Sequence, residues 1–446
     1  MVAKSIEGTL ALVLVLSVSL CGSLRNMKTQ YAWKTADYDF PKNNPRESFL
    51  ASGQYSPPDI IILDASVWEG PHNQEKVFVT TPRLRNGTPA TLSVVTSKMR
   101  NNAPLLAPYP DWSWHRQGDC NGMISVFRTA VDECDRLWVT DTGYSHAENK
   151  RVCPPQILAF DLHTNKLLGR YIFPKNLYER KSLFITTKID TRGQKCADTF
   201  AYIADVTDFK LVVFNANEQR SWKIESNYFY PDPLQGVFNI NGVQFDLMDG
   251  IFGITLGPLI NKNRMLYFHA LASVHESWVH TCVVRNESLF ANEVNLSPRS
   301  FKISQGTRTS QSAAEDMTDD GILFFPLIAE NALACWNSRL PYDSSNIEIV
   351  EQDDERLQFA SGLKVHKNKV WVTTSRFQNY FTNIMNPNET NFRITVGRVD
   401  DLVRGTTCEM PNGGSHHNSY KPKPKPRPPP HSGSGSSYQP LVFENN

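Results

Sequence analysis

The chain has 446 residues, enough for several ordinary domains or for one large repeat architecture. Its 46 Lys and Arg nearly balance its 45 Asp and Glu, which argues against a nucleic-acid-binding surface. An aromatic share of 11%, with 24 Gly and 28 Pro to supply turns, favours an all-β protein over a helical one.

Residues 1–23 have the layout of a secretory signal peptide. Lys4 precedes an apolar segment from Leu10 to Leu20, and small residues follow it. The apolar segment is shorter than a bilayer-spanning helix, and no later stretch supplies about 20 apolar residues. A retained N-terminal anchor is the alternative, but it requires a longer apolar run. We therefore expect a secreted, extracellular protein without a membrane span.

Secretion makes disulfides and glycans expected features. Seven cysteines remain once Cys21 has left with the signal peptide, and none forms a C-x-x-C pair that would indicate a thiolate zinc site. Four N-x-S/T sequons predict glycosylated surface loops, at Asn86, Asn286, Asn295 and Asn388. Proline follows the sequons at Asn86 and Asn295, which makes those two weaker acceptors.

Six short apolar strands of similar composition recur along the chain: Val77–Thr81, Leu137–Asp141, Ala201–Asp205, Ile251–Thr255, Ile322–Pro326 and Val370–Thr374. Another strand precedes each of them: Ile60–Leu63, Met123–Val131, Leu183–Ile189, Val243–Met248, Ser310–Met317 and Ala360–Val365. A third strand follows each, and a fourth is plausible in places. Six four-stranded units closed into a ring predict a six-bladed β-propeller over residues 24–410. Two β-sandwiches are the alternative, although sandwiches rarely repeat one strand signature this often.

Propeller geometry places particular residues around the central channel. The first strand of each blade lines the channel, and in an antiparallel pair its start lies beside the end of the second strand. Polar residues at these positions are expected at one mouth of the channel: Asn121, Asp141, Asp205, Gln244, Thr255, Ser310, Gln311, Ser361, Thr374 and Arg376.

The same geometry constrains disulfide pairing. Cys120 and Cys153 lie on one face of the same blade, whereas Cys134 and Cys196 occupy matching turns of neighbouring blades on the opposite face. We predict three pairs: Cys120 with Cys153, Cys134 with Cys196, and Cys335 with Cys408. Each bridge stabilises the fold by about 2–4 kcal/mol, mainly by restricting the unfolded chain.

The composition changes at Pro411. Residues 421–430 read KPKPKPRPPP, and a Ser/Gly run follows. Such a segment cannot bury a core, so residues 411–446 are expected to form a disordered, partly polyproline tail. Its four cations could hold an acidic surface weakly, and a solvated spacer is the commoner role.

Two stretches, residues 111–143 and 306–338, resemble the signature of the insect yellow and major royal jelly protein family. The resemblance extends over about Trp33 to Cys408 and is closer to the yellow branch. It implies a secreted six-bladed propeller and one of three roles: pigmentation of cuticle or eggshell, in some members by dopachrome conversion; binding of biogenic amines; or nutrition.

Dopachrome conversion moves a proton from the carbon beside the substrate carboxylate, with or without loss of CO2, and requires no cofactor. It needs a base, donors at the quinone oxygens and a cation for the carboxylate. The catalytic candidates are Glu315, Asp141 and His115. Their structural alternatives are an ion pair with Arg308, a turn acceptor of backbone N–H groups, and a solvent-facing loop residue, respectively. The ligand-binding candidates are Asn121, Asp205, Gln244, Arg308, Ser310, Gln311, Ser312, Phe325 and Arg376.

Three histidines, His269, His275 and His280, suggest a metal site, but strand alternation would point the last two to opposite faces. We therefore expect no metal. The leading hypothesis is an extracellular dopachrome tautomerase or decarboxylase. The alternatives are a non-catalytic binder of dopamine, serotonin or a cuticle component, and a calcium-dependent lactonase, which would require converging carboxylates.

Overall fold

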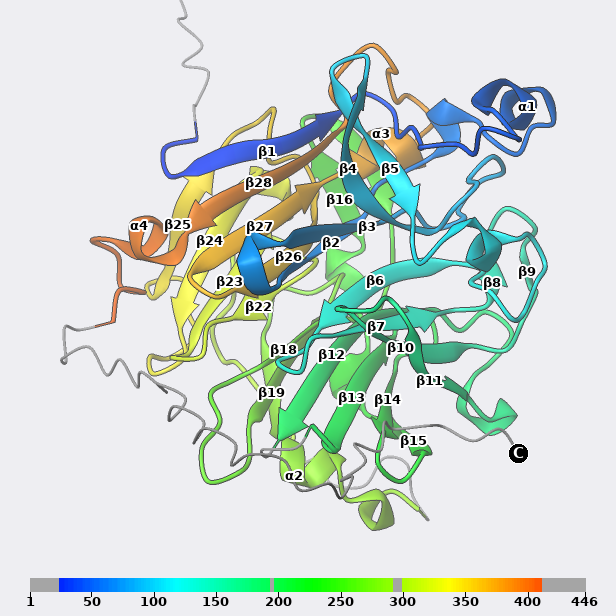
Figure 1. The fold of residues 1–446 in the computed structure, drawn as a ribbon. Helices are drawn as coiled ribbons and strands as arrows, with labels where there is room; N and C mark the ends of the chain where they lie inside the picture. The colour runs from blue at the N-terminus through cyan, green and yellow to red at the C-terminus, as the bar shows by residue number, and fades with distance from the viewer. Residues whose placement is uncertain (1–23, 193–195, 292–298, 411–446) are drawn as a thin grey trace, which may run out of the picture.

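The structure, a computed structural model, describes residues 24–192, 196–291 and 299–410. It contains six four-stranded antiparallel sheets whose innermost strands contact one another in a closed cycle, so the predicted six-bladed propeller is confirmed (Figure 1). The predicted signal peptide (1–23), the predicted tail (411–446) and the sequon at Asn295 lie outside the described residues. No helix in the described ranges is long and apolar enough to cross a membrane.

Each blade has four strands, in the following order from the innermost strand outward. Blade one contains β2 (Asp64–Glu69), β3 (Glu75–Thr80), β4 (Leu92–Arg100) and β5 (Ala103–Pro108); blade two contains β6 (Val126–Val131), β7 (Arg136–Asp141), β10 (Gln156–Asp161) and β11 (Leu167–Ile172); and blade three contains β12 (Phe184–Arg192), β13 (Asp198–Asp205), β14 (Lys210–Asn215) and β15 (Arg220–Glu225). Blade four contains β18 (Ile251–Leu256), β19 (Met265–Ala270), β20 (Ser277–His280) and β21 (Lys302–Ile303); blade five contains β22 (Asp316–Met317), β23 (Ile322–Leu327), β24 (Ala332–Asn337) and β25 (Ile347–Gln352); and blade six contains β26 (Ala360–His366), β27 (Lys369–Thr374), β28 (Phe392–Arg398) and β1 (Met27–Trp33).

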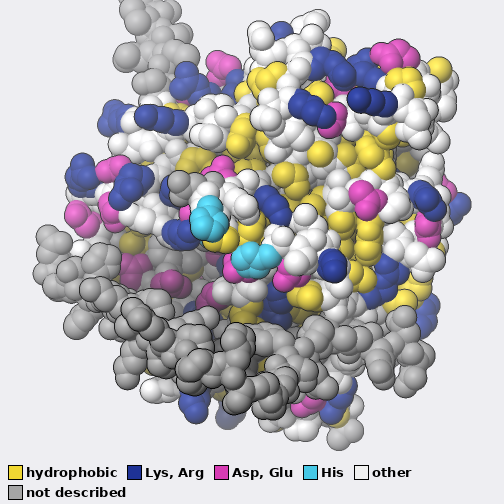
Figure 2. Space-filling model, viewed as in Figure 1, with side chains coloured by type: hydrophobic (Ala, Val, Ile, Leu, Met, Phe, Trp, Pro, Cys, Tyr) yellow, Lys and Arg dark blue, Asp and Glu magenta, His cyan; other side chains and the backbone are white. Residues whose placement is uncertain are grey.

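Short elements connect and cover the blades. Two hairpins stand apart from them, β8–β9 (Tyr144–Ser145 and Lys150–Arg151) and β16–β17 (Val237–Ile240 and Val243–Asp246). The α-helices are α1 (Arg46–Ala51), α2 (Thr281–Val284), α3 (Phe377–Phe381) and α4 (Val399–Val403). Acidic and basic side chains are interspersed over the face in Figure 2, in keeping with the near-zero net charge.

Packing between blades explains the apolar strand signature. Every residue of β7, β18, β23 and β24 is buried, because each blade is covered on both faces by its neighbours. The ring closes where β1, from the N-terminal part of the chain, pairs with β28 (Figure 1). Blade six is therefore built from both ends of the propeller, and the pairing of β1 with β28 joins them.

Three of the predicted first strands differ in the structure. In blade one, the innermost strand is β2 (Asp64–Glu69), and the predicted Ile60–Leu63 segment directly precedes it. In blade four, Ile251–Leu256 is the innermost strand rather than the second, and Val243–Asp246 belongs to the separate β16–β17 hairpin. Both segments satisfy the same pattern of two strands joined by a turn. Gln244 and Asp246 are exposed, whereas every residue of β18 is buried, as the inner position requires. In blade five, the regular strand is limited to Asp316–Met317, and the small polar residues before it form no ladder.

The three disulfides join the pairs predicted from the sequence: Cys120–Cys153, Cys134–Cys196 and Cys335–Cys408, with Cα–Cα distances of 5.5, 6.1 and 6.2 Å. Cys282 is exposed and unpaired among the described cysteines. Three of the sequon asparagines, Asn86, Asn286 and Asn388, are exposed, which is compatible with glycan attachment.

Candidate ligand-binding site at the hub

A chamber of about 450 Å³ opens at the hub, on the face of the ring where the innermost strands begin. Residues of β6, β12, β18 and β26 line it. Six aromatic side chains form much of its wall: Phe127, Phe252, Phe359, Phe377, Tyr380 and Phe381. The sequence predicts a polar channel mouth at this end of the hub, whereas the wall of the chamber is largely aromatic and aliphatic.

The aromatic wall comes from several separate segments. Phe127 and Phe252 are each the second residue of an innermost strand, and α3 supplies three more rings. The β16–β17 hairpin covers this wall, since the Phe245 ring lies 5.8 Å from that of Phe377 and 5.2 Å from that of Phe381. The chamber is thus a slot between rings, a shape that suits a flat aromatic molecule.

Arg128 is the cationic group of the chamber floor. Its guanidinium carbon lies 4.6 Å from the centre of the Phe252 ring, and it donates hydrogen bonds to the Thr186 hydroxyl at 3.1 Å and to the Ser361 carbonyl at 2.5 Å. Burial lowers the pKa of Arg128 to about 10, so the guanidinium remains charged at neutral pH. A buried cation at the end of an aromatic slot can attract a carboxylate.

Asp249 is the acidic group of the chamber wall. Its carboxylate receives no hydrogen bond from the described residues, and burial together with the negative charge of Asp205 raises the pKa of Asp249 to about 7. His146 lines the same wall, and burial lowers its pKa to about 4, so its ring is neutral at neutral pH. Asp249 is therefore a carboxyl group that titrates close to physiological pH and is free to contact a ligand.

Ion pairs lie along the axis beyond Arg128. Lys364 Nζ lies 3.2 Å from an Asp64 carboxylate oxygen, and Lys188 pairs with Asp316. Lys188, Asp316 and Lys364 also border a much smaller cavity of about 90 Å³. The charged side chains on these innermost strands thus separate the aromatic chamber from this second cavity.

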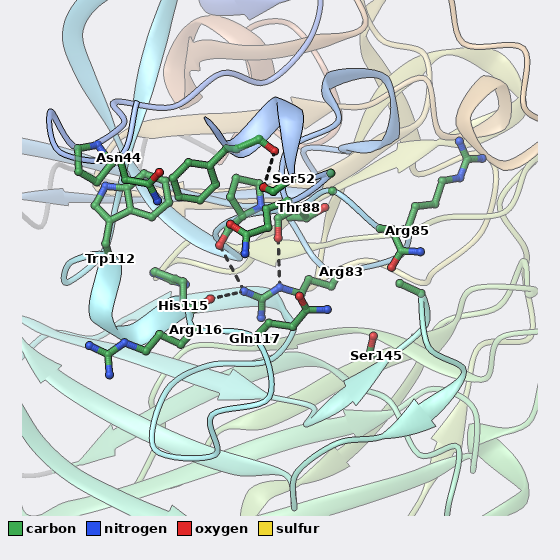
Figure 3. A pocket seen from close by; sticks show the side chains of 18 of the residues that line it. Asn44, Ser52, Arg83, Arg85, Thr88, Trp112, His115, Arg116, Gln117 and Ser145 are labelled. Carbon is green, nitrogen blue, oxygen red and sulfur yellow. Dashed lines mark hydrogen bonds between the residues drawn. The ribbon is translucent and has the colours of Figure 1, made fainter. Parts of the chain in front are cut away.

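A second large cavity, of about 730 Å³, lies beside blade one and is shown in Figure 3. Its central residue is Arg83, whose guanidinium donates hydrogen bonds to backbone carbonyls, including those of Thr88 at 3.2 Å and His115 at 2.7 Å. Because Arg83 is occupied by the backbone, we assign it to holding the surrounding loops together.

Comparisons with known proteins identify the family. A family model described as "Major royal jelly protein" matches residues 124–408. Major royal jelly protein 8 of Apis mellifera is 34% identical over 404 residues, which cover 86% of this chain and 94% of that protein. Protein yellow of Drosophila melanogaster is 33% identical over 424 residues, which cover 93% of this chain and 76% of that protein. The chain belongs to the yellow and major royal jelly protein family.

Two solved structures show a distant likeness to this family member. A streptogramin B lyase is 12% identical, with a TM-score of 0.39 over 76% of this chain and 94% of that chain. An α-L-arabinofuranosidase from Fusarium graminearum is 9% identical, with a TM-score of 0.46 over 85% of this chain and 99% of that chain. Likeness of this degree does not bear on function.

None of the three catalytic candidates from the sequence of this family member lines the chamber. Asp141 accepts backbone N–H groups of Ile124 and Ser125 at 2.9 and 2.7 Å, the structural alternative stated for it. His115, in the short 3₁₀ helix Trp112–His115, is buried and hydrogen-bonds the Tyr109 carbonyl through Nε2 at 3.0 Å. Burial and the charge of Arg83 lower the pKa of His115 to about 3, so it remains neutral.

The ligand-binding candidates fall into two groups by exposure, and none lines the chamber. Two are exposed, Asn121 and Gln244, and the others are buried: Asp205, Arg308, Ser310, Gln311, Ser312, Phe325 and Arg376. Gln311 donates to the carbonyls of Gln235 and Val237 at 3.0 and 2.9 Å, which ties the β16–β17 region to blade five. Arg376 pairs with Glu389 at 2.5 Å, and Asp205 accepts the N–H of Leu183 at 2.9 Å.

Glu315, the remaining candidate, belongs to a buried cluster between blades four and five. His269 Nδ1 lies 2.9 Å from Glu276 Oε2 and 3.2 Å from Glu315 Oε2. Arg308 Nη1 lies 3.4 Å from Glu276 Oε2, so the predicted partner of Glu315 instead contacts its neighbour. Within the described ranges, His269, Glu276 and Glu315 are the one group of three whose donor atoms lie close enough to hold a metal ion.

Sequence reasoning missed Arg128, Asp249 and the aromatic wall. Arg128 could have been identified from the sequence, because an arginine inside a mostly apolar innermost strand requires a partner in the channel. Asp249 could not have been identified in this way, since an Asp-Gly pair between two strands usually indicates a turn.

Proposed function

We propose that this protein is an extracellular dopachrome-converting enzyme of melanin pigmentation, of the yellow branch, and that the hub chamber is its active site. The observation that carries the proposal is an aromatic slot with a free carboxyl group on its wall and a buried cation on its floor. The identities to major royal jelly and yellow proteins are nearly equal, so the chemistry of the chamber is the ground for choosing the branch.

Dopachrome offers a flat ring, a carboxylate and quinone oxygens. In the proposed complex the ring stacks between Phe127, Phe252 and the rings of α3, and its carboxylate faces Arg128. In tautomerisation, ionised Asp249 takes the proton from the carbon beside the carboxylate, the C–H electron pair moves into the quinone, and a quinone oxygen gains a proton. A second proton then moves from the neighbouring ring carbon to the other oxygen, which completes the aromatic indole. In decarboxylation the bond to the carboxylate breaks instead of that first C–H bond and supplies the electron pair as CO2 leaves. Neither route needs an oxidant, because the two electrons stay within the product. A base whose pKa is about 7 suits this proton transfer at physiological pH.

The test uses the purified full chain and freshly prepared dopachrome. We expect faster loss of the visible absorbance than in buffer, and the indole product, with or without its carboxylate, distinguishes tautomerisation from decarboxylation. Asp246→Asn, which changes an exposed residue of β17, is the matched control for Asp249→Asn. A folded wild-type protein that fails to accelerate the reaction rules out the enzymatic function.

The second candidate is a non-catalytic binder of dopamine, serotonin or related catechols. It is favoured by Asp249 itself, since a carboxylate among aromatic faces is a good partner for an ammonium group. Calorimetry separates the two cases: dopamine or serotonin bound tightly through Asp249, with no turnover of dopachrome, indicates a binder. For either function, we propose that the protein is secreted and contacts cuticle components. We also propose that it is glycosylated at Asn86, Asn286 and Asn388.

A further inference from the structure

The buried cluster between blades four and five has the construction of a metal centre. His269 is on β19, Glu276 directly precedes β20, and Glu315 directly precedes β22. All three side chains are almost completely buried, with at most 1% of each exposed. Donor atoms held about 2.1 Å from one metal ion lie about 3.0–3.4 Å apart in octahedral or tetrahedral geometry, close to the 2.9 and 3.2 Å that separate His269 from the two carboxylates.

Hydrogen bonding orients the imidazole for coordination. His269 Nε2 lies 3.0 Å from the Ala313 carbonyl oxygen, which can only accept, so Nε2 carries a proton. With no proton on Nδ1, the lone pair of this nitrogen points at both carboxylates. A histidine that ligates a metal through one nitrogen and donates to a carbonyl through the other has this arrangement.

The carboxylates lack the hydrogen bonds that their burial demands. Three of the four carboxylate oxygens have no hydrogen-bond partner among the described residues: both oxygens of Glu315 and Oε1 of Glu276. Arg308 reaches only one oxygen of Glu276, and its other bonds go to the Tyr342 hydroxyl and to the carbonyls of Ser273 and His275. Buried carboxylates in this state require a cation at the point where they converge.

The surrounding backbone makes room for the site. Gly253 on β18 pairs with His269, and a Cβ at this position would lie 2.4 Å from His269 Cε1. The chain between Gly306 and Glu315 forms no regular ladder, so blade five lacks strand bonds beside this point. A ligand that joins Glu315 to β19 would supply the missing cross-link between the blades.

We propose that His269, Glu276 and Glu315 bind one divalent transition-metal ion, with zinc the best match to one imidazole and two carboxylates. Its role is structural: the ion fastens the segment before β22 to blade four. Since the cluster does not line the chamber, the metal lies outside the proposed catalytic site.

A proton on Nδ1 is the competing occupant. Although burial opposes the charge, the negative charge of Glu315 raises the pKa of His269 to about 9, which allows a buried imidazolium paired with both carboxylates. The experiment must therefore distinguish a bound metal from a bound proton.

The test begins with the full chain carrying His416→Ala and His417→Ala, which removes the adjacent tail histidines as adventitious ligands. The protein is stripped with a chelator, reloaded with Zn²⁺ or Co²⁺, and assayed for metal by mass spectrometry and for thermal stability. We expect one ion per chain, a midpoint several degrees higher than in the stripped protein, and a cobalt spectrum with a nitrogen ligand. Failure of the stripped protein to take up one equivalent means that the cluster is an imidazolium ion pair and overturns the proposal.

Variants then locate the ion. Glu315→Gln, which is nearly isosteric, should weaken zinc binding at least 10-fold, whereas His280→Gln, at an exposed histidine at the end of β20, should leave it unchanged. Equal binding by Glu315→Gln and the parent places the ion elsewhere and refutes the assignment. If Glu315→Gln does not fold, the nitrogen chemical shifts of His269 in the stripped and zinc-loaded parent decide, because coordination replaces the proton at Nδ1.

Discussion

Replacing Asp249 by Asn should remove function and increase stability at the same time. The carboxyl group is placed in the chamber at an energetic cost that the isosteric amide avoids. In the folded chain burial and the charge of Asp205 raise the pKa of Asp249 to about 7, compared with an ordinary value of 3.8. The folded state therefore holds the Asp249 proton more tightly than the unfolded state does.

The sign and size of the effect follow from linkage. Asp249 does not oppose folding below pH 4, and its unfavourable contribution grows as the pH rises from about 4 to about 7. Because one pKa unit corresponds to about 1.4 kcal/mol, the cost above pH 7 is at most about 4 kcal/mol. Asp249 is partly exposed to the chamber, so water screens its charge, and we expect about 1–3 kcal/mol.

Thermal unfolding at pH 5 and pH 8 measures this difference. Asp249→Asn should raise the midpoint at pH 8 by roughly 2–5 °C and change it much less at pH 5. In the same preparation, dopachrome conversion should fall about 100-fold or more, as expected for loss of a general base. Asp246→Asn should change neither quantity. A variant that is less stable than the wild type at pH 8, or that retains full activity, refutes the reasoning about this carboxyl group.

Three further predictions concern the aromatic wall of the chamber, the Cys335–Cys408 disulfide and the glycine that packs against His269. Phe381→Ala should weaken dopamine or dopachrome binding about 3- to 10-fold, because an aromatic contact contributes about 0.5–1.5 kcal/mol; this ring is partly exposed, so calorimetry should find the loss without a large change in stability. The double change of Cys335 and Cys408 to Ser should lower the free energy of unfolding by about 2–4 kcal/mol in denaturant titration, and an unchanged value would show that the bridge adds nothing to the fold. Gly253→Ala should cost about 1–3 kcal/mol by overpacking and abolish zinc uptake, since the new Cβ meets the His269 ring; normal zinc uptake by this variant contradicts the assignment.

The ring of blades could be predicted because its signal is local and repeated. Each apolar run covered on both faces identifies a strand inside a blade, and six repeats leave a closed array as the simplest arrangement. The Cys134–Cys196 pair followed from the same regularity, since equivalent turns of neighbouring blades lie side by side. The first strands of blades one, four and five were less predictable. In blade four, β16–β17 and β18–β19 show the same strand-turn-strand pattern, and only burial distinguishes them.

The chamber could not be predicted, because its residues meet only after the ring has closed. Phe127, Phe252, Phe359 and Phe377 are far apart in the chain, and each is equally compatible with ordinary packing between blades. The polar residues chosen from the sequence include ones that the structure uses for its own backbone: Asp141 and Asp205 both accept N–H groups at the start of an innermost strand. Alternation along a strand shows which face a side chain occupies, but not whether a backbone donor already satisfies it.

The charged side chains across the axis close the inner end of the hub chamber. In the part of the chain that is described, Arg128 and the pairs Lys364–Asp64 and Lys188–Asp316 stand between the two cavities. A small molecule must then leave through the same opening by which it entered, and a second ligand can bind only after the first has left. A small flat molecule fits such a chamber, whereas a polymer cannot be threaded through the disc.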